Sequence, residues 1–134
     1  TQYTSSAASD VYKRQIYDRI HKVIKIPIVF DYHHHRFCTG GQTEEEALKL
    51  AASTWPSDIK PVVHLSESRA AEYNDPKIRP QAHSDFILSP INSYGQEHDI
   101  MLECKMKEVA LLKYRGIMEA SNNEINGELL EARV

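Results

Sequence analysis

The fold can be derived outward from one segment, Ile28-Val29-Phe30-Asp31-Tyr32-His33-His34-His35. Its three apolar residues have the character of a short buried strand, and the pattern ends at an acid, Asp31. Two later segments repeat this order, with Val62-Val63 before His64 and Ile100-Met101-Leu102 before Glu103. Each apolar run therefore ends in a side chain of the kind that binds divalent metal ions.

The spacing of these three residues indicates a repeated structural unit. They are separated by 33 residues (64 − 31) and 39 residues (103 − 64), close to the roughly 30 or more residues of a βαβ unit. The carboxyl ends of parallel strands meet at one side of a sheet, where functional residues gather. We therefore predict an α/β fold of three consecutive βα units, each of which delivers a metal ligand to a common face.

The bulk composition is that of an ordinary globular domain. The chain has 134 residues, of which 41% are hydrophobic and 26% are charged, values typical of one folded domain. No apolar run approaches the roughly 20 residues of a membrane span, and no signal peptide precedes the fold. We expect a protein that is neither secreted nor embedded in a membrane. The net charge of −3 does not by itself favour nucleic-acid binding.

The remaining pattern predicts helices between the strands. An apolar stripe predicts a helix over residues 16–24 that packs on the sheet and ends before Pro27. Thr43 and Glu46 form a capping box for a second helix, and residues 105–118 predict a third. Ser89-Pro90 resembles the start of a short helix through Tyr94. Residues 66–85 form a long polar loop of the kind that is usually functional.

Three segments organise the chain. Residues 1–15 lack periodicity, so we expect a disordered or non-native leader. Residues 16–120 contain the predicted α/β domain, and residues 121–134 form a polar tail. The chain does not begin with methionine, which suggests a piece of a longer protein.

The candidate ligands combine carboxylate and imidazole groups, a set that suits Zn, Mn or Fe better than Ca or Mg alone. An acid at the end of an apolar run, such as Asp31 or Glu103, has a large desolvation cost unless it binds a cation or forms a salt bridge with Lys or Arg. His34 follows Asp31 by one tight turn. His83 lies in the long loop, where a histidine taken alone is more often structural than a metal ligand. The candidate metal ligands are Asp31, His34, His64, His83 and Glu103.

Basic residues flank two of these ligands. Arg36 follows the histidine triplet, and Lys105 and Lys107 follow Glu103. Basic groups beside a metal cluster bind phosphate. The alternative is that these residues only balance the charge of the acidic ligands.

Four blocks together resemble the C-terminal part of the UV damage endonuclease family, namely residues 28–35, Pro61-Val-Val-His-Leu-Ser-Glu-Ser68, Arg79-Pro-Gln-Ala-His-Ser-Asp85 and residues 100–111. Their order and spacing match as well, and the resemblance extends over residues 16–118. It implies an incomplete (β/α)₈ TIM barrel related to endonuclease IV, of which this chain supplies the last three βα units.

The resemblance also implies a cluster of divalent metals at the barrel mouth, often manganese, with zinc or magnesium as alternatives. By position, the five candidate ligands match those of the family, and Asp31 and Glu103 are expected to be catalytic because they serve the metals that activate water. Some members have a lysine, thought to be carboxylated, two residues before the equivalent of His64. Val62 occupies that position here.

The implied function is incision of damaged double-stranded DNA on the 5′ side of a UV photoproduct. We expect this chain to be inactive alone, and its longer parent to be a monomeric bacterial enzyme in the cytoplasm or on the nucleoid. A metal-dependent sugar isomerase on the same barrel is the alternative from another enzyme class. A third possibility is a non-enzymatic fragment whose histidines only fill space.

Overall fold

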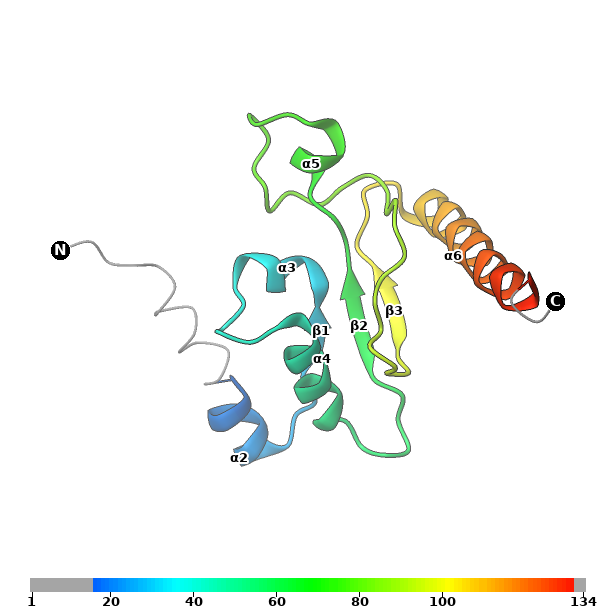
Figure 1. Ribbon diagram of the computed structural model, residues 1–134. Helices are drawn as coiled ribbons and strands as arrows, with labels where there is room; N and C mark the ends of the chain where they lie inside the picture. The colour runs from blue at the N-terminus through cyan, green and yellow to red at the C-terminus, as the bar shows by residue number, and fades with distance from the viewer. Residues whose placement is uncertain (1–15, 132–134) are drawn as a thin grey trace. The chain divides into compact units, whose positions relative to one another are not determined.

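The protein is described here by a computed structural model that covers residues 16–131, with side chains through residue 125 (Figure 1). The predicted leader, residues 1–15, lies outside the described residues. In order, the elements are η1 (Ile16–His21), α2 (Lys22–Ile24), β1 (Phe30–Asp31), α3 (Tyr32–Phe37), α4 (Glu44–Ser53), β2 (Val62–Leu65), α5 (Arg69–Tyr73), β3 (Asp99–Leu102) and α6 (Lys107–Glu131).

A three-stranded sheet has the order β1-β2-β3, which confirms the predicted α/β class. β1 and β2 are parallel, with Phe30 opposite Val63 and Asp31 opposite His64. The Asp99 N–H donates to the Pro61 carbonyl at 2.8 Å where β3 begins beside β2. The arrows of β2 and β3 run in the same direction. The strands are shorter than the apolar runs, since β1 holds only the last residue of Ile28-Val29-Phe30 together with Asp31.

The contacts divide the chain into two units. The first contains residues up to Leu65 together with Ser93–Met101, and the second contains Ser66–Asn92 together with residues from Leu102 onward. In the first unit, α4 contacts β1, and α3 contacts β1 and β2. Its buried side chains include Phe30, Tyr32, Leu48 and Val63.

α4 begins at the predicted capping box. The Glu46 N–H donates to Thr43 Oγ1 at 3.2 Å, and the Thr43 N–H donates to Glu46 Oε2 at 2.8 Å. Just after the helix, Trp55 Nε1 donates to the Ile28 carbonyl at 2.9 Å, and the Ile28 N–H donates to Thr54 Oγ1 at 2.8 Å. The end of α4 therefore holds the segment that leads into β1, the strand that ends at Asp31.

Thr43→Ala is expected to lower the free energy of unfolding by about 1 kcal/mol, because the Glu46 N–H loses its acceptor, Thr43 Oγ1. Urea denaturation of the chain measures the change. Thr43→Ser keeps the hydroxyl and serves as the control. An equal loss in both variants would contradict a role for the capping hydroxyl.

The region before β1 departs from the predicted helix. It consists of one π-helical segment, η1, and a short α2 that ends at Lys25 with a left-handed φ of 60°. The side chains of Ile20, Val23 and Ile24 are exposed. The prediction that this stripe packs on the sheet is therefore wrong for these three residues.

The helix predicted from Ser89-Pro90 through Tyr94 is absent from this described segment. A tight turn lies at its end instead, where the Gln96 N–H donates to the Ser93 carbonyl at 2.9 Å. Tyr94 and Gly95 occupy its two central positions with φ of 49° and 74°, values that a right-handed helix excludes. Ser89-Pro90 is therefore not the start of a helix in this protein.

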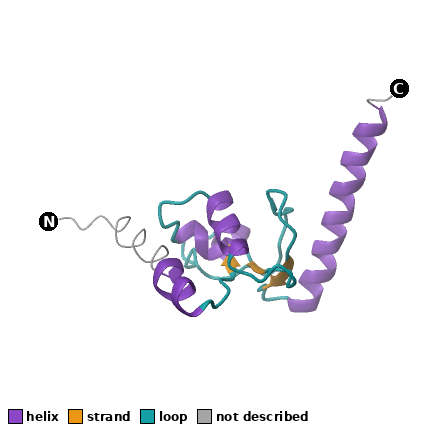
Figure 2. Ribbon diagram, turned by 90° about the horizontal axis from the view of Figure 1, so that it is seen from below, coloured by secondary structure: helices purple, strands orange, loops and turns teal. Residues whose placement is uncertain are grey.

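The second unit contains α5 and α6, with Ile87, Cys104, Ala110 and Tyr114 among its buried side chains. α6 begins two residues later than predicted and continues to Glu131 as one helix (Figure 2). Most of the predicted polar tail is thus helical. None of the helices in the described part of the chain is both long enough and apolar enough to cross a membrane.

Candidate metal centre

Asp31 and His64 are neighbours because their strands pair in register. Along β2, Val63 and Leu65 are buried, with 2% and 1% of their surface exposed. Val62 and His64 alternate with them and are only half-buried. Since successive side chains of a strand point to opposite faces, the burial of Val63 and Leu65 fixes the face on which His64 lies.

Asp31 has a second role as the N-cap of α3. Its Oδ1 accepts the His34 backbone N–H at 2.9 Å, and its Oδ2 lies 2.7 Å from His34 Nδ1. Both carboxylate oxygens therefore contact the same residue, which fixes the orientation of the acid. The sequence reasoning missed α3, although an aspartate directly after an apolar run is a common N-cap signal.

α3 places the three consecutive histidines in two different environments. His33 and His35 are buried, and their rings lie 5.1 Å from Phe37 and 5.4 Å from Phe30, between centroids. His34 is exposed between them. His34 is therefore the member of the triplet whose ring reaches both solvent and the Asp31 carboxylate.

Glu103 follows β3 directly, and His83 contacts it within the second unit. His83 Nδ1 lies 2.9 Å from the Glu103 carbonyl oxygen and 3.8 Å from its Oε2. An isolated antiparallel bridge between Ser68 and His83 holds the backbone of the histidine. The long loop therefore returns His83 to the residue that ends the third strand.

Ser84 connects three segments around this pair and was not singled out by the sequence. Its side chain is fully buried, its Oγ accepts the Glu67 N–H at 3.2 Å, and its carbonyl accepts the Lys105 N–H at 2.9 Å. Burial raises the pKa of the Cys104 thiol to about 11, and a hydrogen bond with Ser84 partly offsets this shift. Ser84 thus connects the backbone just after Glu103 with the backbone of Glu67, next to His83.

Ser84→Ala is expected to lower the free energy of unfolding by about 1–2 kcal/mol, because the Glu67 N–H loses its acceptor in a largely buried setting. Hydrogen exchange at the Glu67 amide should become faster. Ser66→Ala is the matched control, since Ser66 is 1% exposed and its Oγ has no hydrogen-bond partner among the described residues. Equal destabilisation by the two variants would mean that only packing, and not the hydrogen bond, is lost.

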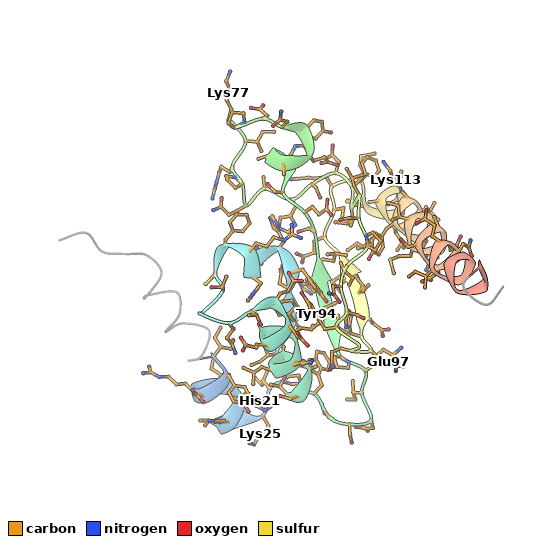
Figure 3. All side chains as sticks on the ribbon, in the orientation of Figure 1. His21, Lys25, Lys77, Tyr94, Glu97 and Lys113 are labelled. Carbon is orange, nitrogen blue, oxygen red and sulfur yellow. The ribbon has the colours of Figure 1, made fainter. Side chains whose placement is uncertain are left out.

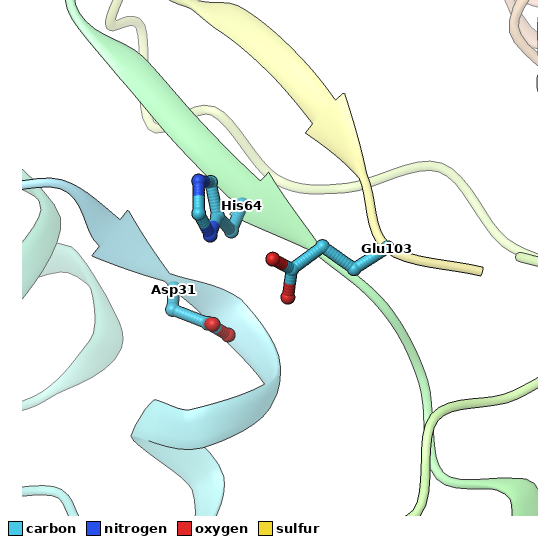
Figure 4. A group of neighbouring side chains, drawn as sticks. All are labelled: Asp31, His64 and Glu103. Carbon is cyan, nitrogen blue, oxygen red and sulfur yellow. The ribbon is translucent and has the colours of Figure 1, made fainter.

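Asp31, His64 and Glu103 form a group of potential metal ligands (Figure 4). One ligand atom from each residue lies within 4.8 Å of the other two, and all three side chains are partly buried. Two carboxylates and an imidazole at such separations match the donor set of a transition-metal ion. The residues present therefore fit a divalent cation.

The other predicted site residues lie outside this group of three. His34 and His83 each contact one of its members, as described above. Arg36, Lys105 and Lys107 are exposed. Within residues 16–125 no hydrogen bond or ion pair involves these three side chains, so they are open to solvent.

Comparisons with known proteins point to one family. The profile of a family described as UV-endonuclease UvdE matches residues 12–129. A UV DNA damage endonuclease of Bacillus mycoides (strain KBAB4) is 38% identical over 98 residues, which are 66% of this chain and 29% of that protein. The enzyme of the same name from Bacillus cereus (strain 03BB102) is 35% identical over 117 residues, covering 75% of this chain and 35% of the relative.

A solved structure agrees with these sequence matches. The crystal structure of SacUVDE superposes on 78% of this chain and 35% of its own, with a TM-score of 0.59 and 29% sequence identity. The chain therefore spans about a third of the length of the proteins it matches.

Proposed function

Because the chain belongs to the UV-endonuclease UvdE family, we propose that it forms part of a metal-dependent DNA repair endonuclease that nicks damaged double-stranded DNA on the 5′ side of a UV photoproduct. The observation that supports this proposal most directly is the group of Asp31, His64 and Glu103 at the ends of three successive strands. The relatives favour this enzyme class over a sugar isomerase.

The proposed architecture is the last part of a TIM barrel. Residues 16–120 would supply three βα units of a (β/α)₈ barrel, and residues 121–134 would continue as a polar extension. The parallel register of β1 and β2 and the superposition with SacUVDE support this arrangement. The remaining strands would come from protein outside this sequence, as the greater length of the relatives suggests.

Manganese is the cation that we propose for the site, with zinc or magnesium as alternatives. Asp31, His64 and Glu103 would hold it directly, and His34 and His83 would serve as further ligands. When bound, divalent ions acidify a water molecule, orient the scissile phosphate and stabilise the leaving oxygen. Asp31 and Glu103 are the proposed catalytic residues, because their carboxylates would hold the ions that activate the water molecule.

The structure also suggests how the chain orients its own ligands. His34 contacts both oxygens of Asp31, and His83 contacts the backbone and side chain of Glu103. Neighbouring groups of this kind fix the rotamer of a ligand before the ion arrives. Val62, two residues before His64, has no donor atom in its side chain, so it cannot replace the lysine found there in some members.

The substrate and setting follow from the same proposal. Arg36, Lys105 and Lys107 would contact phosphates of the damaged duplex, since each is exposed. The parent protein would act as a monomer in the bacterial cytoplasm or on the nucleoid.

A chimera provides the test of function. Residues 16–120 of this chain would replace the matching segment of the Bacillus cereus relative, and nicking of UV-irradiated plasmid would be measured with Mn²⁺. We expect the chimera to nick irradiated plasmid in preference to untreated plasmid, and the chain alone to be inactive. A chimera that folds but does not nick, beside an active parent relative, would contradict the proposal.

A further inference from the structure

Between β2 and His83 the chain makes a closed detour, residues 69–82, which we call the excursion. Its base is held by a hydrogen bond from the Arg69 N–H to the Ala82 carbonyl at 2.8 Å and by the bridge between Ser68 and His83. His83 in turn contacts Glu103. The base of the excursion therefore lies beside a proposed metal ligand, and its tip is separated from that base by α5.

Hydrogen bonds organise the tip into a series of turns. Asn74 ends α5 in the left-handed conformation, with φ of 48°. The Asp75 carboxylate accepts the Lys77 N–H at 2.9 Å, and the Ala82 N–H donates to the Arg79 carbonyl at 2.9 Å. Proline residues at 76 and 80 restrict the backbone further. Side chains at the tip are thus presented from an ordered backbone.

The acids of this region are bound by internal donors. Glu72 accepts the backbone N–H groups of Asp85 at 2.7 Å and Phe86 at 3.0 Å. Asp85 accepts hydrogen bonds from Arg69 and Tyr73, and Asp75 accepts from Lys77 N–H as noted above. The negative charges near the excursion therefore face its own backbone or Arg69.

Two cations are left at the tip. Lys77 and Arg79 are exposed, and neither forms an ion pair with another residue in the described part of the chain. Lys77 points away from the ribbon at the end of the excursion (Figure 3). Charge is thus segregated, with the acids turned inward and the cations turned to solvent.

We propose that Lys77 and Arg79 form a phosphate-binding tip that contacts the DNA backbone near the incised bond. This inference rests on the proposed function. The excursion begins and ends beside His83, which contacts Glu103, so the cations at its tip would meet backbone phosphates of a duplex bound at the proposed site. Such contacts fix the register of the duplex without reading its sequence.

Equilibrium binding of this chain to a fluorescent UV-irradiated duplex, in chelator and over a series of NaCl concentrations, tests the proposal. Each lost phosphate contact reduces the slope of log affinity against log salt by about 0.9, so Lys77→Gln with Arg79→Gln should reduce it by about 1.8. The charge-conserving pair Lys77→Arg with Arg79→Lys should retain the slope. Thermal unfolding would verify that each variant is folded.

A second pair of cations serves as a control that distinguishes a local phosphate contact from a general effect of net charge. Arg19 and Lys25 are exposed and precede β1, so Arg19→Gln with Lys25→Gln changes the net charge equally. We expect this pair to leave the slope almost unchanged. Equal slopes for the two Gln pairs would overturn the phosphate-binding tip while leaving the proposed function intact. Absence of duplex binding by the unaltered chain would overturn the tip, and Mn²⁺-dependent nicking by the chimera would show independently whether the proposed function also fails.

Discussion

Asp31→Asn is expected to weaken Mn²⁺ binding by about 100-fold or more, since even groups that only support a metal ligand cost 10- to 100-fold when they are changed. Asparagine has nearly the same shape and can still accept the His34 N–H that aspartate accepts now. It is as good an N-cap as aspartate. The metal-free stability should therefore change by less than about 1 kcal/mol, because the contact that is altered is made with the exposed ring of His34.

Titration with Mn²⁺, followed by the electron paramagnetic resonance of the free ion, measures the affinity, and urea denaturation in chelator measures the stability. Asp31→Ala is the informative companion, because it removes the cap as well and should cost about 1 kcal/mol more in stability. Unchanged Mn²⁺ affinity in Asp31→Asn would show that this carboxylate is only a helix cap.

Leu65→Ala is expected to lower the free energy of unfolding by about 2–5 kcal/mol, because it leaves a cavity at a fully packed position. Leu65 is 1% exposed and directly follows His64 on β2. A domain has only about 5–15 kcal/mol of stability in total, so this loss would be severe. The same burial fixes the face of the strand to which His64 belongs.

Leu88→Ala provides the comparison, since Leu88 is 51% exposed and surface substitutions usually change stability by less than about 0.5 kcal/mol. The urea midpoint should fall strongly in the first variant and little in the second, with similar slopes in both. A small effect of Leu65→Ala would mean that β2 does not bury this face, and the position of His64 would lose its physical basis.

The strand ends could be predicted from the sequence because two physical signals coincide there. Apolar runs such as Val62-Val63 are typical of strands, and the ionisable residue that follows each run lies at the carboxyl end of its strand. The burial of the runs is only partial, since Val29 and Met101 are exposed. Parallel order then brings these ends together, and the structure places ligand atoms of Asp31, His64 and Glu103 within 4.8 Å of one another. The capping box of α4 could also be predicted from the sequence, because it depends only on Thr43 and Glu46 at a fixed spacing.

Other features depend on contacts that no local pattern records. Ser84 is important because Glu67 and Lys105 lie beside it, and neither is near it in sequence. α5 was missed within a segment that looked irregular, although Ser68 caps it and Arg69-Ala-Ala-Glu72 favours a helix. The region from Ser89 to Tyr94 shows the opposite error, since a good start signal was followed by a turn with two positive φ values.

The length of α6 shows that a polar stretch of sequence does not by itself end a helix. Asn122 and Asn123 are poor helix formers, yet α6 continues through them to Glu131. The cost of such residues is well below 1 kcal/mol each, and extending an existing helix avoids the cost of nucleating a new one.

Asp31, His64 and Glu103 are proposed to bind one divalent cation together. The most direct measurement is an anomalous difference map from crystals of the chain grown with Mn²⁺. We predict a peak within bonding distance of an oxygen of Asp31, a ring nitrogen of His64 and an oxygen of Glu103. A manganese peak bound elsewhere, or no peak among these three residues at saturating Mn²⁺, would contradict the account.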